Sequence, residues 1–296
     1  MRPFEYQAPA TLEEAVALLQ KWGERARPLA GGTDLIVQLR RGMRQADLLV
    51  DVKRIPELTA IRYDPTEGLI LGAAVPCADV ADHPAVRAYY PALVDGAGII
   101  GGSAIRQRAT VGGNLCNASP SGDAIPPLMV LEARAEIAGP KGRRSVPVSS
   151  FCLAPGRSAL AADELLVSLR LPPPGPREGA RYLRFTPRGE MDIAVVGVAA
   201  WVRWDESYTR ISAARIALGA VASTPLLAQE AAEALIGREP DEAALAQAAR
   251  LAQEAARPID DVRGTFLQRL HLVAVLTRRA LRDALQRAKG AQIDGE

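Results

Sequence analysis

The sequence predicts an α+β protein built from two domains. Up to residue 171, short strand and helix patterns follow one another along the chain. The segment Pro172-Pro-Pro-Gly-Pro176 then has the composition of a linker, and beyond it three strand patterns precede three helical ones. The length of 296 residues also exceeds the usual ~100–150 residues of one domain. We therefore expect a first domain over 1–175, a second over 176–289 and a tail over 290–296.

The elements of the first domain follow from caps, periodicity and turn residues. Thr11 and Glu14 form a capping box, and apolar residues then recur at helical spacing, which predicts a helix over 12–22. Pro and Gly between apolar runs indicate hairpin turns. The remaining expected elements are strands at 27–30, 48–52, 59–63, 69–75, 135–138, 145–148 and 165–171, helices at 35–41, 84–97 and 123–131, and a Gly- and Ser-rich segment over 98–114.

The second domain has a simpler pattern. Long apolar and β-branched runs predict strands at 182–185, 193–204 and 211–221, which would form a three-stranded antiparallel sheet. Helical periodicity follows, and helices are expected at 226–236, 243–256 and 265–289. Strands followed by helices are typical of an α+β domain.

Overall charge and hydropathy exclude several classes of protein. The 36 basic and 34 acidic residues leave a net charge of +2, too small for nucleic-acid binding through bulk charge. No apolar run approaches the ~18 residues that would span a bilayer. The N-terminal residues contain no long apolar stretch of the kind found in signal peptides. We expect a cytoplasmic protein without a transmembrane segment.

The scarcity of cysteine and histidine limits the chemistry of the side chains. Cys77, Cys116 and Cys152 are far apart, and His83 and His271 are the two histidines. Iron–sulfur clusters and structural zinc require closely spaced ligands, so neither is expected. The chain also lacks the G-x-S-x-G nucleophile motif of hydrolases. No catalytic or metal-binding residue is therefore assigned, and a bound cofactor is favoured.

Three glycine pairs are the informative feature of the first domain: Gly31-Gly32, Gly101-Gly102 and Gly112-Gly113. Glycine allows the backbone to approach a ligand closely, and successive amides can converge on an anion. The polar neighbours Thr33 and Asn114 can hydrogen-bond to phosphate or hydroxyl groups. Each pair alone is better explained as a tight turn, and none matches the Rossmann or P-loop pattern. Three polar-flanked pairs in one domain favour a phosphate-bearing ligand.

Two longer segments carry a resemblance to a known family. Pro28-Leu-Ala-Gly-Gly-Thr-Asp-Leu35 and Thr110-Val-Gly-Gly-Asn-Leu-Cys-Asn-Ala-Ser-Pro-Ser-Gly-Asp123 resemble the two FAD-binding signatures of molybdenum hydroxylase flavoprotein subunits. These are the medium subunits of aerobic carbon monoxide dehydrogenase and of bacterial xanthine dehydrogenase. The segments 104–109, 184–194 and 258–263 also fit this family, so the resemblance spans nearly the whole chain.

The resemblance implies a fold and a set of cofactor contacts. The fold is an FAD-binding domain of the vanillyl-alcohol oxidase (PCMH) type, made of two α+β subdomains, followed by a flavoprotein C-terminal domain. Ile100 would pack near the flavin, Asp123 would accept hydrogen bonds from FAD, and Arg184 stands where the family has a lysine, with the same charge but another geometry. The full set implied to bind FAD is Pro28, Leu29, Ala30, Gly31, Gly32, Thr33, Asp34, Leu35, Ile100, Gly101, Thr110, Val111, Gly112, Gly113, Asn114, Asp123, Leu166 and Arg184.

The resemblance also implies partners and a direction of electron flow. Substrate would be oxidised at a molybdopterin cofactor on a large subunit, and electrons would pass through [2Fe–2S] clusters of a small subunit to FAD on this chain. A dimer of such heterotrimers is expected. Two alternatives remain: a stand-alone FAD-dependent oxidoreductase of the same superfamily, and a nucleotide-binding or scaffold protein with no redox role. Neither the substrate nor the final acceptor, whether NAD, quinone or oxygen, follows from this chain.

Overall fold

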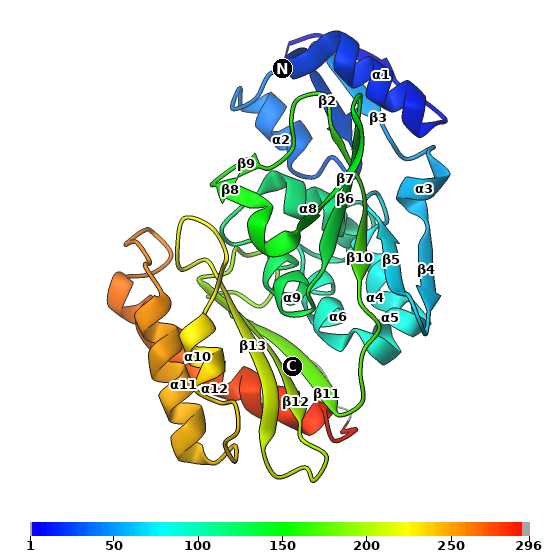
Figure 1. The fold of residues 1–296 in the computed structure, drawn as a ribbon. Helices are drawn as coiled ribbons and strands as arrows, with labels where there is room; N and C mark the ends of the chain where they lie inside the picture. The colour runs from blue at the N-terminus through cyan, green and yellow to red at the C-terminus, as the bar shows by residue number, and fades with distance from the viewer. Residues whose placement is uncertain (1, 292–296) are drawn as a thin grey trace.

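The computed structural model describes residues 2–291 and contains three layered units along its long axis (Figure 1). The first is a small parallel sheet, the second a five-stranded antiparallel sheet, and the third a four-stranded antiparallel sheet. Helices cover each sheet, and the first two sheets share part of one core, because Ala138, Leu165 and Val167 of the second pack with residues of the first. The α+β class and the two subdomains of the first domain are as the sequence predicts.

The first unit is formed by strands in the order β1-β3-β2, all parallel. The Thr11 hydroxyl accepts the Glu14 amide at 3.2 Å and caps α1, while the Glu14 carboxylate accepts the Ala10 amide at 3.0 Å. The helix begins and ends where the capping box and periodicity predict. The elements are β1 (Glu5–Gln7), α1 (Leu12–Trp22), η1 (Gly23–Arg25), β2 (Ala26–Leu29), α2 (Leu35–Arg40), β3 (Leu48–Asp51) and α3 (Pro56–Thr59).

The second unit has the strand order β4-β5-β10-β6-β7. The helix expected over 84–97 is divided in two at Tyr90, because Pro91 disfavours helical backbone at the residue before it. The Gly- and Ser-rich segment 98–114, to which the sequence analysis assigned no element, contains α7 and the start of α8. The elements are β4 (Ile61–Asp64), β5 (Gly68–Gly72), α4 (Cys77–Asp82), α5 (Pro84–Tyr89), α6 (Pro91–Ala97), α7 (Ser103–Arg106), α8 (Val111–Asn117), α9 (Ile125–Val130), β6 (Arg134–Gly139), β7 (Gly142–Pro147), η2 (Val148–Ser150), β8 (Cys152–Ala154), β9 (Arg157–Ser158) and β10 (Leu165–Leu171).

The third unit differs from the prediction by one strand. Its sheet has the order β11-β12-β13-β14, four strands and not three. The helix expected from residue 226 begins only at Gln229, because Leu226 and Leu227 pair with β13 instead. This long-range pairing is invisible to local periodicity. The elements are β11 (Glu178–Phe185), β12 (Val196–Trp204), β13 (Ile211–Gly219), β14 (Leu226–Leu227), α10 (Gln229–Glu233), α11 (Glu242–Ala255) and α12 (Phe266–Arg287).

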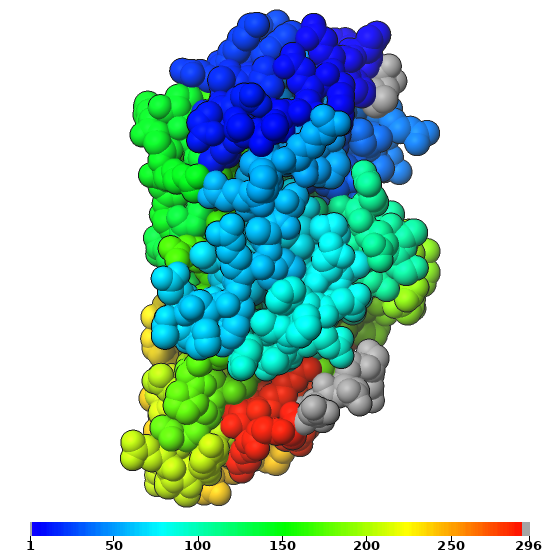
Figure 2. Space-filling view, turned by 90° about the vertical axis from the view of Figure 1, so that its right-hand side faces the viewer, coloured from blue at the N-terminus to red at the C-terminus, as the bar shows by residue number. Residues whose placement is uncertain are grey.

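The third unit is attached to the second by packing and by charge. The segment 172–176 connects β10 to β11, and α9 packs on β12 and β13. Figure 2 shows the red end of α12 directly below the cyan surface formed by the second unit's helices. There the carboxylate of Asp95 on α6 accepts hydrogen bonds from Arg287 at 2.7 and 3.0 Å, from Arg181 at 3.1 Å and from the Tyr182 amide at 3.0 Å.

The C-terminal tail is the last segment that the sequence predicts. The tail expected over 290–296 follows α12, and residues 292–296 lie outside the described part of the chain. Within residues 2–291, no helix is both long and apolar enough to cross a membrane.

Candidate functional site

A cleft of about 680 Å³ lies between the first unit and the second. Its volume is within the range of small-molecule sites, ~300–1,000 Å³. Its walls come from β2, α2, α8, the β8–β9 hairpin and the start of β10, segments that are distant in sequence and adjacent in space (Figure 1). Of the residues predicted to bind FAD, those lining the cleft are Pro28, Leu29, Ala30, Gly31, Gly32, Thr33, Asp34, Leu35, Ile100, Thr110, Gly112, Gly113, Asn114 and Leu166.

The first glycine pair brings the chain close to the second motif. A side chain at Gly31 would overlap the carbonyl oxygen of Arg108, so the two loops can approach only with glycine at this position. Gly32 has φ +76°, a backbone conformation that side chains with a Cβ rarely adopt. The bend at Gly32 ends β2 and turns the chain into α2 along the cleft.

The two glycines of the 112–113 pair have different structural roles. A Cβ at Gly112 would lie 2.5 Å from the Ala73 oxygen, so this glycine lets α8 pack on the end of β5. A Cβ at Gly113 would lie 2.9 Å from the Thr110 hydroxyl and, apart from the backbone of its own helix, would meet no other atom of the described residues within 4 Å. That hydroxyl accepts the Gly113 amide at 2.8 Å and caps α8. Gly113 therefore leaves space on the cleft side of the helix.

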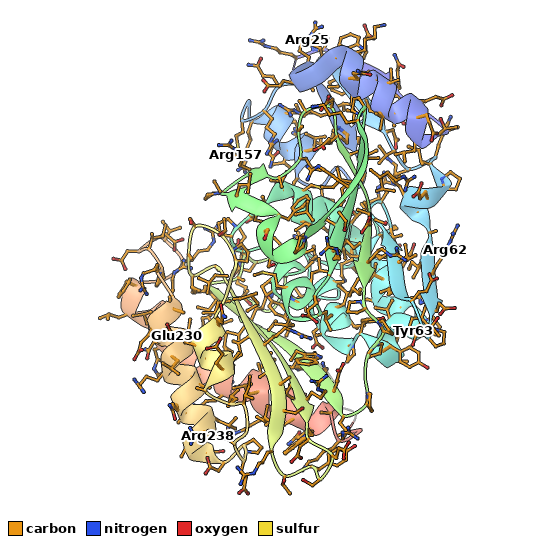
Figure 3. All side chains as sticks on the ribbon, in the orientation of Figure 1. Arg25, Arg62, Tyr63, Arg157, Glu230 and Arg238 are labelled. Carbon is orange, nitrogen blue, oxygen red and sulfur yellow. The ribbon has the colours of Figure 1, made fainter. Side chains whose placement is uncertain are left out.

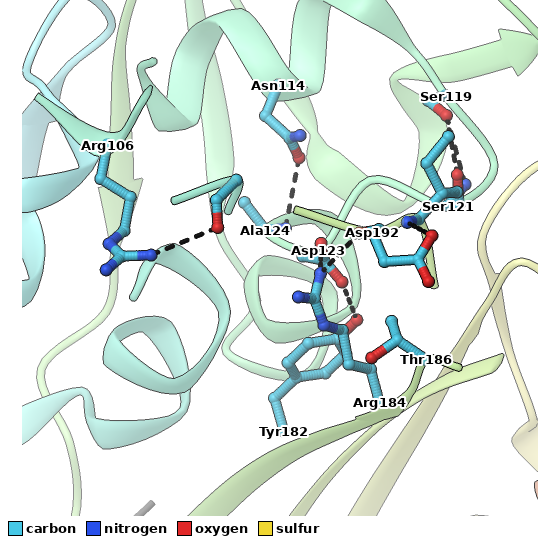
Figure 4. Close-up of polar contacts among 12 residues, drawn as sticks. Arg106, Asn114, Ser119, Ser121, Asp123, Ala124, Tyr182, Arg184, Thr186 and Asp192 are labelled. Carbon is cyan, nitrogen blue, oxygen red and sulfur yellow. Dashed lines mark hydrogen bonds and ion pairs between the residues drawn. The ribbon is translucent and has the colours of Figure 1, made fainter. Parts of the chain in front are cut away.

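The third pair lies beside the cleft and not in its wall. Ile100 lines the cleft, whereas Gly101, with φ +59°, does not. Arg106 donates to the Gly101 carbonyl at 3.3 Å and holds this turn (Figure 4). A Cβ at Gly102 would be 3.1 Å from the sulfur of Met191, which belongs to the segment between β11 and β12. Val111, likewise predicted to bind FAD, is buried in the core of the second unit.

Five polar residues with a role in the cleft, Gln38, Asn117, Arg27, Arg44 and Arg157, were not assigned to the site by the sequence analysis. Gln38 donates to Asn117 at 2.8 Å, and Arg44 donates to the Gly156 carbonyl at 3.1 Å. Arg27 and Arg157 also line the cleft, the latter on the β8–β9 hairpin (Figure 3). A signal for two of them exists: Gln38 follows Asp34 by four residues and Asn117 follows Asn114 by three, so each lies on the same helical face as a predicted residue.

The cleft is a favourable environment for an anion. Burial and the nearby Arg44 lower the pKa of the Arg27 guanidinium, and burial raises the pKa of the Asp34 carboxyl. Burial also raises the pKa of the Cys116 thiol to about 12, which makes it a poor nucleophile. Glu164 is paired with Arg144 at 2.6 Å, which neutralises part of the acidic charge. Three arginines remain around the cleft to balance phosphate groups.

Asp123 and Arg184 lie beyond the cleft wall and contact each other. Arg184 donates to one oxygen of Asp123 at 2.6 Å, and the Tyr182 hydroxyl donates to the other at 2.8 Å (Figure 4). Burial raises the pKa of Asp123, while Arg184 and Tyr182 oppose this shift. Tyr182 was also missed, although it is two residues from Arg184 and therefore on the same face of β11. The adjacent Ala124 amide donates to Asn114 in the cleft at 3.2 Å.

These residues fit an FAD molecule. Gly113 leaves the helix start accessible, the turn at Gly32 adds a second stretch of close backbone approach, and the arginines supply positive charge for a pyrophosphate. Thr33, Gln38, Asn114 and Asn117 offer hydrogen bonds for hydroxyl groups. Among residues 2–291, no group of three or more His, Cys, Asp or Glu side chains is arranged to hold a metal ion.

Comparison with known proteins gives matches over nearly the whole chain. Residues 2–174 match the FAD-binding domain of molybdopterin dehydrogenases, and residues 181–284 match the C-terminal domain of the carbon monoxide dehydrogenase flavoprotein. The xanthine dehydrogenase FAD-binding subunit of Escherichia coli O157:H7 is 32% identical over 96% of this chain and 97% of the relative. The carbon monoxide dehydrogenase medium chain of Hydrogenophaga pseudoflava is 33% identical over 96% and 98%.

Solved structures agree with these relatives. A chain of carbon monoxide dehydrogenase from H. pseudoflava superimposes with a TM-score of 0.92 at 33% identity, covering 97% of this chain and 98% of that one. Quinoline 2-oxidoreductase from Pseudomonas putida 86 gives 0.89 at 32% identity, covering 96% and 98%. The resemblance carried by the two glycine motifs is thus confirmed. This chain belongs to the FAD-binding medium subunits of the molybdenum hydroxylases, a family of oxidoreductases.

Proposed function

We propose that this subunit is the electron exit of a three-subunit molybdenum hydroxylase. Electrons would reach its FAD from [2Fe–2S] clusters of a small subunit and leave to an external acceptor. FAD suits this position because it accepts electrons singly and can release them as a pair. The observation that carries the proposal is the cleft, in which both FAD signatures face the same space.

The role of the chain itself is to bind and orient the cofactor. We propose that Pro28–Leu35, Thr110–Asn114, Ile100, Gly101 and Leu166 hold FAD, with Asp123 and Arg184 at its periphery. Gln38, Asn117, Arg27, Arg44 and Arg157 extend this set, because they line the same cleft. None of these side chains is assigned a proton-transfer step.

The expected assembly is part of the same proposal. A large molybdopterin subunit would oxidise the substrate, and two heterotrimers would associate in the cytoplasm. Support comes from the names of the relatives, which are medium chains or FAD-binding subunits. The domain limits of 1–175 and 176–289 are proposed as well, and the proline-rich segment at 172–176 favours them.

The test compares the subunit alone with the complex co-expressed from neighbouring genes. Acid precipitation of either preparation is expected to release FAD, because burial raises the pKa of Cys116, the cysteine in the cleft, to about 12 and makes it a poor nucleophile for covalent attachment. Candidate aldehydes, purines and carbon monoxide are then mixed with each preparation, and flavin absorbance is followed. We expect reduction only in the complex. Rapid reduction of the lone subunit would instead identify a stand-alone oxidoreductase, and a protein that binds no FAD would be a scaffold.

A further inference from the structure

The carboxylate of Asp123 connects the first domain with β11 through side-chain hydrogen bonds. Asp123 is 7% exposed and is the last residue of the second FAD signature. One carboxylate oxygen accepts a hydrogen bond from the Tyr182 hydroxyl, and the other accepts one from Arg184. Tyr182 is 3% exposed, and burial together with Asp123 raises its pKa well above the ordinary value, so the phenol stays protonated and donates. Hydrogen bonds to a charged group in such a buried setting are stronger than those between neutral groups.

The contacts of this group extend to the cleft in two directions. The Ala124 amide donates to Asn114, which ties the backbone after Asp123 to the cleft wall (Figure 4). In the other direction, Arg184 donates to the Asp192 carbonyl at 3.4 Å. The preceding residue, Met191, contacts Gly102 next to the turn that carries Ile100. The Asp123 group therefore connects β11 with one end of the cleft.

The position of Tyr182 is itself constrained by the sheet. Gly197 on β12 faces the phenol, and a Cβ at that position would lie 2.5 Å from the Tyr182 hydroxyl. The neighbouring strand thus has no side chain where the hydroxyl must lie to reach Asp123. The register, which pairs Arg184 with Gly197, keeps both donors on the same carboxylate.

We infer that Tyr182 is a positioning residue for the bound FAD. The Tyr182 hydroxyl fixes the orientation of the Asp123 carboxylate, and this carboxylate orients the Arg184 guanidinium. The two charges are thereby held in a fixed position beside the cofactor. The inference rests on the proposed function, in which FAD occupies the cleft. Charge close to a flavin alters both its affinity and its reduction potential. Without the Tyr182 hydroxyl, the Asp123 carboxylate would lose one hydrogen-bond donor, and less of its negative charge would be compensated.

The test is Tyr182→Phe in the co-expressed complex. The FAD is removed, the protein is titrated with FAD, and the midpoint potential of the bound flavin is measured. Loss of one hydrogen bond to a charged group is expected to weaken FAD binding about tenfold. The potential is expected to become more negative, because unopposed negative charge disfavours the uptake of electrons.

Tyr90→Phe is the matched control. Tyr90 is equally buried, and its hydroxyl donates to the Pro172 carbonyl at 2.9 Å, away from Asp123. It should leave the FAD affinity and the potential unchanged. Gly197→Ala is a second, independent variant that keeps the phenol but displaces it, and it should shift the potential in the same direction as Tyr182→Phe.

An unchanged potential in Tyr182→Phe would overturn the inference, whether or not stability or affinity falls, because Tyr182 would then be a structural contact between the domains. Equal shifts in Tyr182→Phe and Tyr90→Phe would overturn it as well. If the unmodified complex itself binds no FAD, the proposed function fails together with this inference. A normal FAD content in the unmodified complex with an unchanged variant rejects the inference alone.

Discussion

Replacing Asp95 with alanine is expected to lower the free energy of unfolding by about 3–5 kcal/mol, as found when one partner of a buried ion pair is removed. The Asp95 carboxylate is shared by two arginines, and its side chain is 11% exposed, against 5% for Arg181 and 9% for Arg287. Three elements meet there: α6, β11 and α12. Without the carboxylate, Arg181 and Arg287 would lose their shared anionic partner in a region that water hardly reaches, and Arg181 would keep its ion pair with Asp283 at 3.3 Å.

The measurement is urea unfolding followed by circular dichroism, with Glu57→Ala as the matched control. Glu57 also pairs with an arginine, Arg143, but the two side chains are 43% and 55% exposed. Exposed pairs contribute only ~0–1 kcal/mol, so the control should unfold close to the unmodified protein. Equal shifts in the unfolding midpoint for Asp95→Ala and Glu57→Ala would contradict this account of how the two domains are held together.

Valine at Gly113 is expected to weaken FAD binding by a hundredfold or more while the chain still folds. Apart from the backbone of its own helix, a Cβ at Gly113 would meet, among residues 2–291, the Thr110 hydroxyl alone, at 2.9 Å. The added methyl groups would therefore project into the cleft that we propose for the cofactor. A hundredfold loss corresponds to about 2.7 kcal/mol, within the range of a steric clash in a packed site. Quenching of flavin fluorescence gives the affinity, and far-ultraviolet circular dichroism reports the fold.

The neighbouring glycine provides the contrast. Valine at Gly112 would place its Cβ 2.5 Å from the Ala73 oxygen and 2.7 Å from the Ala73 Cβ, both inside the fold. This variant should therefore lose stability, in contrast with Gly113→Val. Full FAD occupancy in Gly113→Val would mean that the pair is an ordinary turn and that the phosphates bind elsewhere.

The helices that the sequence predicts well are those whose ends are determined locally. The limits of α1 follow from the Thr11 cap and the apolar spacing, and α12 begins at its Thr265 cap, where the hydroxyl accepts the Gln268 amide at 3.2 Å. The division at Tyr90 was missed although Pro91 is visible in the sequence, because helical periodicity continues on both sides. The strand β14 was missed for another reason: it is two residues long and depends wholly on pairing with β13.

In the candidate site too, the sequence predicts the residues of continuous motifs but not the contacts between distant segments. The glycine motifs are continuous in sequence, so their residue types favoured a phosphate-bearing ligand, and their resemblance to known signatures indicated the family. Gln38 belongs to no motif, and Asn117 lies inside the second signature without having been assigned to the site. Only the folded chain brings the two side chains within 2.8 Å of each other across 79 residues. The separate roles of Gly112 and Gly113 depend on which neighbour faces each missing side chain.

By itself, the sequence determined the class of fold, most of its helices and strands, the two glycine-rich segments of the cleft wall and, through their resemblance to known signatures, the FAD-binding family. These depend on spacing, caps and backbone freedom, which act over a few residues. The tertiary structure alone decided that Asp123 pairs with Tyr182 and Arg184, and that Asp95 joins α6 to β11 and α12. Which groups pair with a buried charge depends on burial and geometry after distant segments have packed. The spacing of residues along the chain therefore does not predict these pairs.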